Sequence, residues 1–189
     1  RLRDPVLGGT VQLQGNTLAL WRPDGQDTRR GFASARWDLR RITPLGQAVQ
    51  FTALARGDLY HSQDNALTPT PSYRGEPGWQ TRGAALGAVD VSWPLVGAFL
   101  GGTQVLTPRV QLVAAPAIRN LAVPNEDSRA IDLEDTSLFE LNRFPGYDRI
   151  EEGVRLTYGV DWQLLRPGWE IRSRIGQSYR FTGSRDVLV

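Results

Sequence analysis

Apolar and polar residues alternate with a period of two along most of this chain. In the segment VRLTYGVDWQL, residues 154–164, every second side chain is apolar and the positions between are polar or glycine. After the turn Arg166-Pro167-Gly168 the alternation resumes in WEIRSRIGQSYR, residues 169–180. Successive side chains of a strand point to opposite faces, so the pattern predicts a hairpin of two long strands, each with one apolar and one polar face.

The same alternation predicts further strands earlier in the chain. They are expected over residues 10–22, 28–42, 49–55, 80–93 and 105–114. The predicted connections are short turns at 23–26, 43–46 and 99–102 and long links at 62–79 and 116–153. The total is about seven strands, most of them longer than average. No helical period of comparable strength appears, so the predicted fold class is all-β and antiparallel.

Several features favour a transmembrane β-barrel over the alternative, a soluble β-sandwich binding module. Long two-faced strands with short turns at one end and long loops at the other are typical of such barrels. Charged residues in the middle of polar faces, such as Arg172 and Arg174, suit a water-filled lumen. Strands of about ten residues match a tilted bilayer span. Aromatic residues near strand ends suit a girdle at the membrane surface: Trp21, Trp79, Trp93, Trp169, Tyr179 and Phe181.

Composition removes other possibilities. The 22 basic residues are all Arg, are spread along the chain and balance 20 acidic residues, which argues against nucleic-acid binding. The absence of Cys excludes disulfides and Cys-ligated metal sites. The apolar run at 84–102 is interrupted by Asp90 and Pro94, so it predicts strand, turn and strand instead of a membrane helix. Because the chain lacks Met and opens on Arg1, we expect an interior piece of a longer protein.

Three ordered segments resemble the family of LPS-assembly proteins, LptD. They are TPRVQ at 107–111, SLFELNRFPGYDRIEEG at 137–153, and GQSYRF at 176–181 with Ser184-Arg185 shortly after. The clear resemblance covers residues 105–185. It implies that residues 1–189 are part of a single antiparallel transmembrane β-barrel domain, a partial set of strands from a larger barrel with a long extracellular loop at 116–153. We expect the family's periplasmic jellyroll domain and barrel-closing strands to lie outside this stretch of sequence.

The function that the resemblance implies is transport without catalysis or cofactors. Proteins of this family insert lipopolysaccharide into the outer leaflet of the bacterial outer membrane. The implied partners are an LptE-type lipoprotein plug, lipopolysaccharide, outer-membrane lipid, and the periplasmic Lpt bridge through the absent domain. The alternatives are another outer-membrane barrel, either a porin-like channel or a lipid hydrolase. A channel would need an open lumen without a plug.

Charged residues on the polar faces are candidates for the lumen wall. They are Arg36, Arg155, Asp161, Glu170, Arg172 and Arg174. Arginine forks pair well with phosphate, so these side chains are plausible surfaces for anionic head groups or for the plug. The alternative, which we favour, is that the arginines pair with lumen acids such as Asp161 and Glu170.

The aromatic loop before the last hairpin is the second candidate site. Pro145-Gly146 is a turn signal, and Asp148-Arg149 offers an ion pair or a phosphate contact. Its aromatic residues are too apolar to remain in water, so we expect the loop to fold onto the barrel mouth or onto a partner. By the resemblance it lies at the extracellular end, where it docks the plug or shapes the exit. A self-packed loop that closes the mouth is an equal alternative. The candidate residues are Phe144, Pro145, Gly146, Tyr147, Asp148 and Arg149.

Metal binding and catalysis have little support. The acidic residues upstream of the loop lack the spacing and the Gly of a calcium loop, so we expect a solvated acidic segment. They are Glu126, Asp127, Asp132, Glu134 and Asp135. The single His is His61, and the adjacent Ser62 points to the opposite strand face. A hydrolase would need a lipid-facing Ser within hydrogen-bond reach of His61. No acid–base constellation is recognisable, so we expect no enzyme activity.

Overall fold

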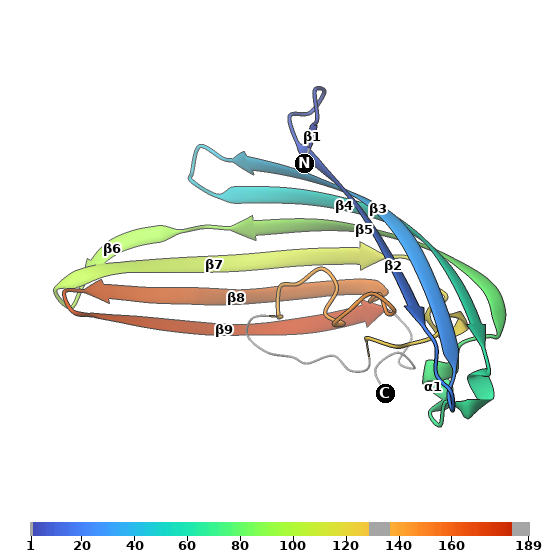
Figure 1. Cartoon of the computed structure of the whole chain (residues 1–189). Helices are drawn as coiled ribbons and strands as arrows, with labels where there is room; N and C mark the ends of the chain where they lie inside the picture. Colours follow the sequence, from blue (N-terminus) through green and yellow to red (C-terminus); the bar gives the residue numbers. More distant parts are fainter. Residues whose placement is uncertain (1, 129–136, 183–189) are drawn as a thin grey trace.

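The computed structural model describes residues 2–128 and 137–182, and this part of the chain forms one antiparallel sheet of nine strands (Figure 1). The strands are β1 (Leu2–Arg3), β2 (Thr10–Leu20), β3 (Asp27–Ile42), β4 (Ala48–Gln63), β5 (Gly78–Ser92), β6 (Leu95–Phe99), β7 (Gly102–Ala115), β8 (Gly153–Arg166) and β9 (Trp169–Thr182). Three short helices lie in the links: η1 (Asn65–Leu67), α1 (Pro71–Arg74) and η2 (Asn120–Ala122). Among the described residues, no helix is long and apolar enough to cross a membrane.

The all-β antiparallel prediction is confirmed. The strands pair in chain order, with β6 beside β7. The β8–β9 hairpin and the limits of the loop at 116–153 agree with the sequence pattern. The predicted count of about seven strands was low because it missed β1 and β6.

The strand β6 exists because the chain bends at Trp93-Pro94. Proline has no N–H to donate, so a continuous β5 cannot extend through this position. The chain resumes as β6, which pairs with β7 through a tight turn. Leu100 and Gly101 form this turn with φ of 47° and 72°, the left-handed conformation that a two-residue hairpin requires.

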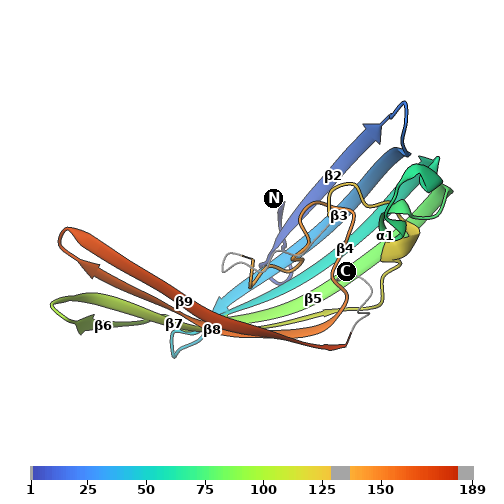
Figure 2. The same cartoon turned by 90° about the horizontal axis from the view of Figure 1, so that it is seen from below.

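The two faces of the sheet differ as the alternation predicts. One face is covered by residues 116–128 and 137–152, which lie inside the curve of the sheet (Figure 2); we call it the concave face. It carries buried polar residues such as Arg30, Arg82 and Thr157. The outward face carries exposed apolar side chains, including Val160 at 39 % and Ile171 at 42 % exposure.

The outward face agrees poorly with a β-sandwich, which would bury it under a second sheet. Its strand ends carry exposed aromatic rings, and all six girdle residues predicted from the sequence lie between 37 % and 66 % exposed. In the described part of the chain no second sheet covers this face. The sheet therefore has the sidedness of one wall of a membrane barrel.

The two ends of the sheet differ in the length of the links that connect the strands there. Residues 21–26, 64–77 and 116–152 connect strands at one end, which we call the loop end. Residues 43–47, the β6 hairpin and Pro167-Gly168 connect them at the other, the turn end. Long links thus gather at one end, with the short 21–26 turn as the exception.

The junction between β5 and β7 is narrow. Although β5 has 15 residues, it pairs with β7 only from Gly87 to Ser92. Within the described residues, the stretch from Gly78 to Leu86 has a strand partner in β4 alone. The strands β2–β5 and β7–β9 therefore form two wings that share a short ladder.

Candidate functional site

The loop between β7 and β8 covers the loop-end half of the concave face. Phe144, Asp148 and Arg149 are buried, with at most 5 % exposure. Tyr147 is half-buried, whereas Pro145 and Gly146 remain exposed. Of the two alternatives left open by the sequence, these positions favour a loop that packs on its own sheet.

Asp148 is the centre of this packing, and we call its contacts the Asp148 cluster. Its carboxylate accepts hydrogen bonds from Arg30 Nη1 at 2.5 Å and from the Tyr60 hydroxyl at 2.9 Å. The backbone N–H groups of Glu126 and Asp127 donate to its other oxygen at 2.7 and 3.2 Å. Because the carboxylate is fully buried, its charge depends on these donors for stabilisation.

Two further arginines hold the backbone beside the Asp148 cluster. Arg82 donates to the carbonyl oxygen of Asp148 at 2.6 Å, and Arg56 donates to that of Tyr147 at 2.9 Å. Both guanidinium groups also pair with Asp58 on β4. The loop backbone is thus bound by charge-assisted hydrogen bonds from the strands, which are stronger than neutral ones.

Among the described residues, Arg149 is held by backbone carbonyl groups and not by the neighbouring carboxylate of Asp148. Its guanidinium donates to the carbonyl oxygens of Ser72, Asn120 and Val123 at 2.7–3.0 Å. Burial lowers the pKa of Arg149 to about 10, so the group stays protonated at neutral pH. Arg149 therefore connects the 64–77 link to the loop between β7 and β8, and these contacts use its N–H donors.

Tyr147 packs on the concave face of β3. Its ring centroid lies 4.9 Å from that of Phe32, and the guanidinium carbons of Arg30 and Arg56 lie 5.4 and 5.6 Å from it. Its hydroxyl accepts a hydrogen bond from Gln14 Nε2 at 3.1 Å. Tyr147 thus fixes the loop tip against β2 and β3.

Gly146 permits a close approach at the loop tip. It has φ of 71°, and a Cβ atom there would lie 2.4 Å from the carboxyl group of Asp127. That carboxylate accepts hydrogen bonds from the backbone N–H groups of Tyr147 and Asp148, both at 2.9 Å. Burial raises its pKa, but these bonds and the ion pair with Arg30 outweigh it and lower the pKa of Asp127 to about 2.

The prediction of a solvated acidic segment was therefore wrong for its first two residues. Glu126 pairs with Arg22 at 2.8 Å and accepts a hydrogen bond from Thr28, while Asp127 pairs with Arg30 at 2.9 Å. These acids pair with arginines from distant parts of the chain, one in the 21–26 turn and one on β3, which the local sequence cannot reveal. Asp132, Glu134 and Asp135 lie outside the described residues.

A second buried ion cluster lies where the loop reaches β8 and β9. The carboxylate of Glu151 accepts hydrogen bonds from Arg143 of the loop, Arg155 of β8 and Arg180 of β9. Burial raises the pKa of Glu151, but the hydrogen bond from Arg143 and the charge of Arg155 outweigh it and lower the pKa below its ordinary value. We call these four residues the Glu151 cluster.

All six predicted lumen residues lie on the concave face, as the registers of β3, β8 and β9 require. The four arginines among them pair with acids, as the favoured alternative expected. Arg36 Nε is 2.8 Å from Asp38, and Arg155 belongs to the Glu151 cluster. The remaining pairs are Arg172 with Glu170 and Arg174 with Asp161.

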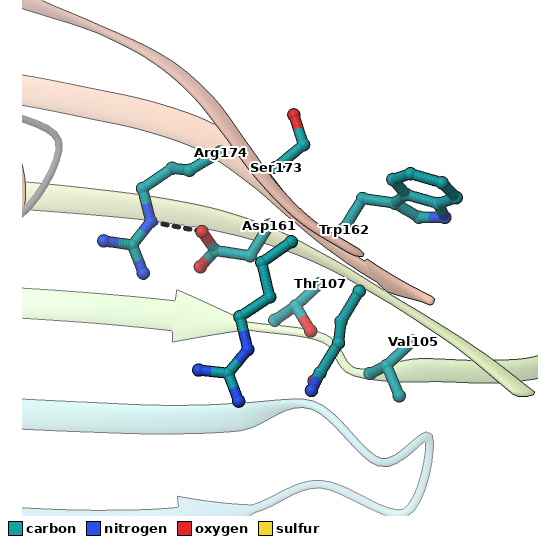
Figure 3. Close-up of a pocket in the computed structure, with 8 residues that line it drawn as sticks. Val105, Thr107, Asp161, Trp162, Ser173 and Arg174 are labelled. Carbon is teal, nitrogen blue, oxygen red and sulfur yellow. Dashed lines mark hydrogen bonds and ion pairs between the residues drawn. The ribbon is translucent and has the colours of Figure 1, made fainter. Parts of the chain in front are cut away.

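The turn-end half of the concave face lies beyond the loop and contains polar hollows. One of about 420 Å³ is lined by β7, β8 and β9, and Figure 3 shows the Asp161–Arg174 pair at it with Thr107 nearby. Another of about 440 Å³ is lined by residues that include Arg36 and Asp38. This half of the face can present both charges and hydrogen-bond donors to a polar solute.

Sequence reasoning missed the strand side of the Asp148 cluster. Arg30 and Arg82 occupy the polar face of predicted strands, and Tyr60 lies beyond the predicted strand 49–55, where extending the alternation toward the loop end would have indicated it. It correctly separated His61 from Ser62. The His61 ring packs on Trp79 at 4.7 Å between centroids on the outward face, whereas Ser62 is buried on the concave face.

Comparisons with known proteins agree on one family. The model of the LptD family, described as LPS transport system D, matches residues 1–188. An LPS-assembly protein LptD from Alcanivorax borkumensis is 31 % identical over 97 % of this chain, which covers 25 % of that protein. The Polaromonas sp. protein of the same name is 40 % identical over 48 % of the chain, covering 12 % of that protein. The chain thus spans about a quarter or less of these relatives.

Proposed function

We propose that this chain, which belongs to the LptD family, forms part of the wall of an outer-membrane β-barrel that delivers lipopolysaccharide to the outer leaflet. The observation that carries the proposal is the sidedness of the sheet: its outward face is apolar and exposed, and its concave face is polar. Such a wall faces lipid on one side and a hydrated lumen on the other. The printed names of the relatives, LPS-assembly proteins, supply the cargo.

The lengths of the links support an orientation. Outer-membrane barrels have short periplasmic turns and longer extracellular loops. The loop end therefore faces the cell exterior, and the turn end faces the periplasm. In this orientation the loop at 116–152 narrows the extracellular half of the lumen, and the polar hollows lie in the periplasmic half.

The periplasmic half suits a hydrated anionic head group. Arg36, Arg172 and Arg174 are already paired with acids, so a phosphate would enter by exchange with these carboxylates. Arg172 is the most accessible of them, with a side chain 75 % exposed. Exchange keeps each contact weak, which allows a solute to move along the wall.

A lipoprotein plug of the LptE type is the proposed partner at the loop. Because Phe144, Asp148 and Arg149 are occupied by the chain itself, the surface left for the plug is the exposed tip at Pro145-Gly146 with one face of Tyr147. We test this contact with a photo-crosslinking residue at Pro145 of the full-length protein. Capture of a small lipoprotein supports the plug, and a crosslinker at the outward Phe51 is the matched control. Capture of the barrel alone contradicts it.

Depletion of the parent protein in its own cell tests the transport function. Newly made lipopolysaccharide is followed by surface labelling, and we expect it to stop reaching the surface and to accumulate inside. Re-expression of the full-length protein should restore delivery. Unchanged delivery during depletion would refute the proposal and favour a porin-like channel, for which solute permeability is then the measurement.

A further inference from the structure

The outward face of β2–β5 carries ionisable side chains only near its two ends in the described part of the chain. Asp27, Arg29 and His61 lie at the loop end, and Arg41 lies at the turn end. Between them β3 presents Gly31, Ala33, Ala35, Trp37 and Leu39 outward. With 16 residues at about 3.3 Å each and a tilt of about 40°, β3 crosses about 40 Å, the thickness of a bilayer with its head-group layers.

Arg29 and His61 form one row with two outward tryptophans at the loop end, Trp21 and Trp79. We call these four residues the outward cationic row. Arg29 lies directly opposite His61, and His61 lies directly opposite Trp79. The Arg29 guanidinium carbon lies 5.4 Å from the centre of the Trp21 ring. The row therefore reads Trp21, Arg29, His61, Trp79.

Arg29 differs from the arginines of the two buried clusters in its partners. The arginines of the Asp148 and Glu151 clusters are paired with carboxylates, whereas no carboxylate of the described residues is hydrogen-bonded or ion-paired to Arg29. The nearby outward acid, Asp27, accepts the backbone N–H of Arg22 at 2.8 Å. Arg29 is exposed, so its N–H donors remain available to a ligand in the head-group layer.

We propose that the outward cationic row binds the phosphate of a membrane lipid head group. Arg29 supplies a planar fork that matches a phosphate, and the His61 imidazole supplies a further N–H donor. The indole rings of Trp21 and Trp79 are 65 % and 66 % exposed and occupy the same interfacial depth, where their flat faces cover the upper acyl chain. The site holds an annular lipid at the outside of the wall and is separate from the transport path in the lumen.

The occupant is a lipid and not free phosphate, because the row borders an uncharged outward surface that becomes apolar toward the membrane centre. Thr17, Leu59 and Thr81 lie next to the row, and Leu13, Ala35, Ala55 and Ala85 lie four residues further along the strands. A molecule with phosphate and acyl chains contacts both surfaces, whereas inorganic phosphate contacts only Arg29 and His61. The inference rests on the proposed membrane orientation, but it does not require that lipopolysaccharide is the cargo.

The test uses the full-length protein in phosphatidylcholine vesicles that contain a small fraction of phosphatidic acid. A photo-crosslinking residue at Thr17 reports lipid bound beside the row. We expect Arg29→Gln to lower capture of phosphatidic acid about fivefold, the effect of one interfacial charge, and Arg29→Lys to retain most of it. Arg41→Gln, at the opposite end of the same strand, is the matched control and should leave capture unchanged.

Equal capture of phosphatidic acid in the wild-type and Arg29→Gln proteins, both shown to be folded by heat-dependent gel mobility, would overturn the inference. Loss of capture on addition of millimolar inorganic phosphate would identify the ligand as free phosphate and also overturn it. Surface labelling of lipopolysaccharide in cells that carry Arg29→Gln separates the two proposals. Normal delivery with reduced capture supports the lipid site and leaves the transport function standing.

Discussion

Replacing Asp148 by asparagine should release the loop while leaving the sheet folded. Arg30 and Tyr60 donate to one carboxylate oxygen, and two backbone N–H groups donate to the other. An asparagine must turn its NH₂ group toward one of these pairs of donors. Toward Arg30 and Tyr60 it loses the bond from Arg30, because only the Tyr60 hydroxyl can accept instead of donate; toward the backbone it loses both N–H bonds. Breaking a buried ion pair costs about 3–5 kcal/mol. Because Arg30 keeps Asp127 as a partner, we expect Asp148→Asn to lower the free energy of opening the loop by about 3 kcal/mol, the lower end of that range.

Hydrogen–deuterium exchange of the full-length protein in nanodiscs measures this effect. A loss of about 3 kcal/mol raises the exchange rate of loop amides in residues 120–128 and 144–152 roughly a hundredfold if they exchange through loop opening. Asp161→Asn is the matched control, because both side chains of its ion pair with Arg174 are about one-third exposed and such pairs contribute little. Loop exchange in Asp148→Asn within about threefold of wild type would refute the role given to Asp148.

Three further predictions concern the wall, the loop chemistry and the loop tip. Val160→Arg should reduce the folded fraction in heat-dependent gel mobility, because a charge facing lipid costs about 2–4 kcal/mol, while Asp161→Asn on the concave face should assemble normally; the reverse ranking would place the lumen on the wrong face. The pKa of Asp127 is lowered in the folded loop, so its carboxylate stabilises the loop by about 2 kcal/mol. This stabilisation is complete above about pH 4 and is lost as the pH falls toward 2. Loop exchange, corrected for its intrinsic pH dependence, should show this step, and Asp127→Asn should remove it; a step that persists in the variant assigns it elsewhere. Gly146→Ala should lower the free energy of opening the loop, and Gly168→Ala that of opening the 167–168 turn, and we expect the loss at Gly146 to be larger by about 2 kcal/mol. Both residues have positive φ, but only at Gly146 would the added Cβ meet a neighbour, the carboxyl group of Asp127. Equal losses in hydrogen–deuterium exchange would mean that the contact with Asp127 is unimportant.

The features that a single strand determines could be predicted from the sequence. Alternation alone assigned the faces of the β8–β9 hairpin, because each side chain's direction follows from its position in the strand. The same rule separated His61 from Ser62 and placed Arg36 and Arg174 on one face. These properties depend only on neighbours along the chain.

The features that depend on distant partners could not be predicted. Glu126 and Asp127 look solvated in sequence, yet each pairs with an arginine about a hundred residues earlier in the chain. The burial of Asp148 depends on Arg30 and Tyr60, which reach it only after the sheet has curved around the loop. The break before β6 was predicted from Pro94, but β6 itself was missed, because its five residues are recognisable as a strand only through their pairing with β7.

The short ladder between β5 and β7 gives the loop a mechanical role. The two wings of the sheet share only the pairs from Gly87 to Ser92, so the wall can bend most easily along this line. Asp148 fastens the loop to β3 and β4 in one wing, and Glu151 fastens it to β8 and β9 in the other. The loop is therefore a cross-tie between the two wings, and it restrains the angle between them.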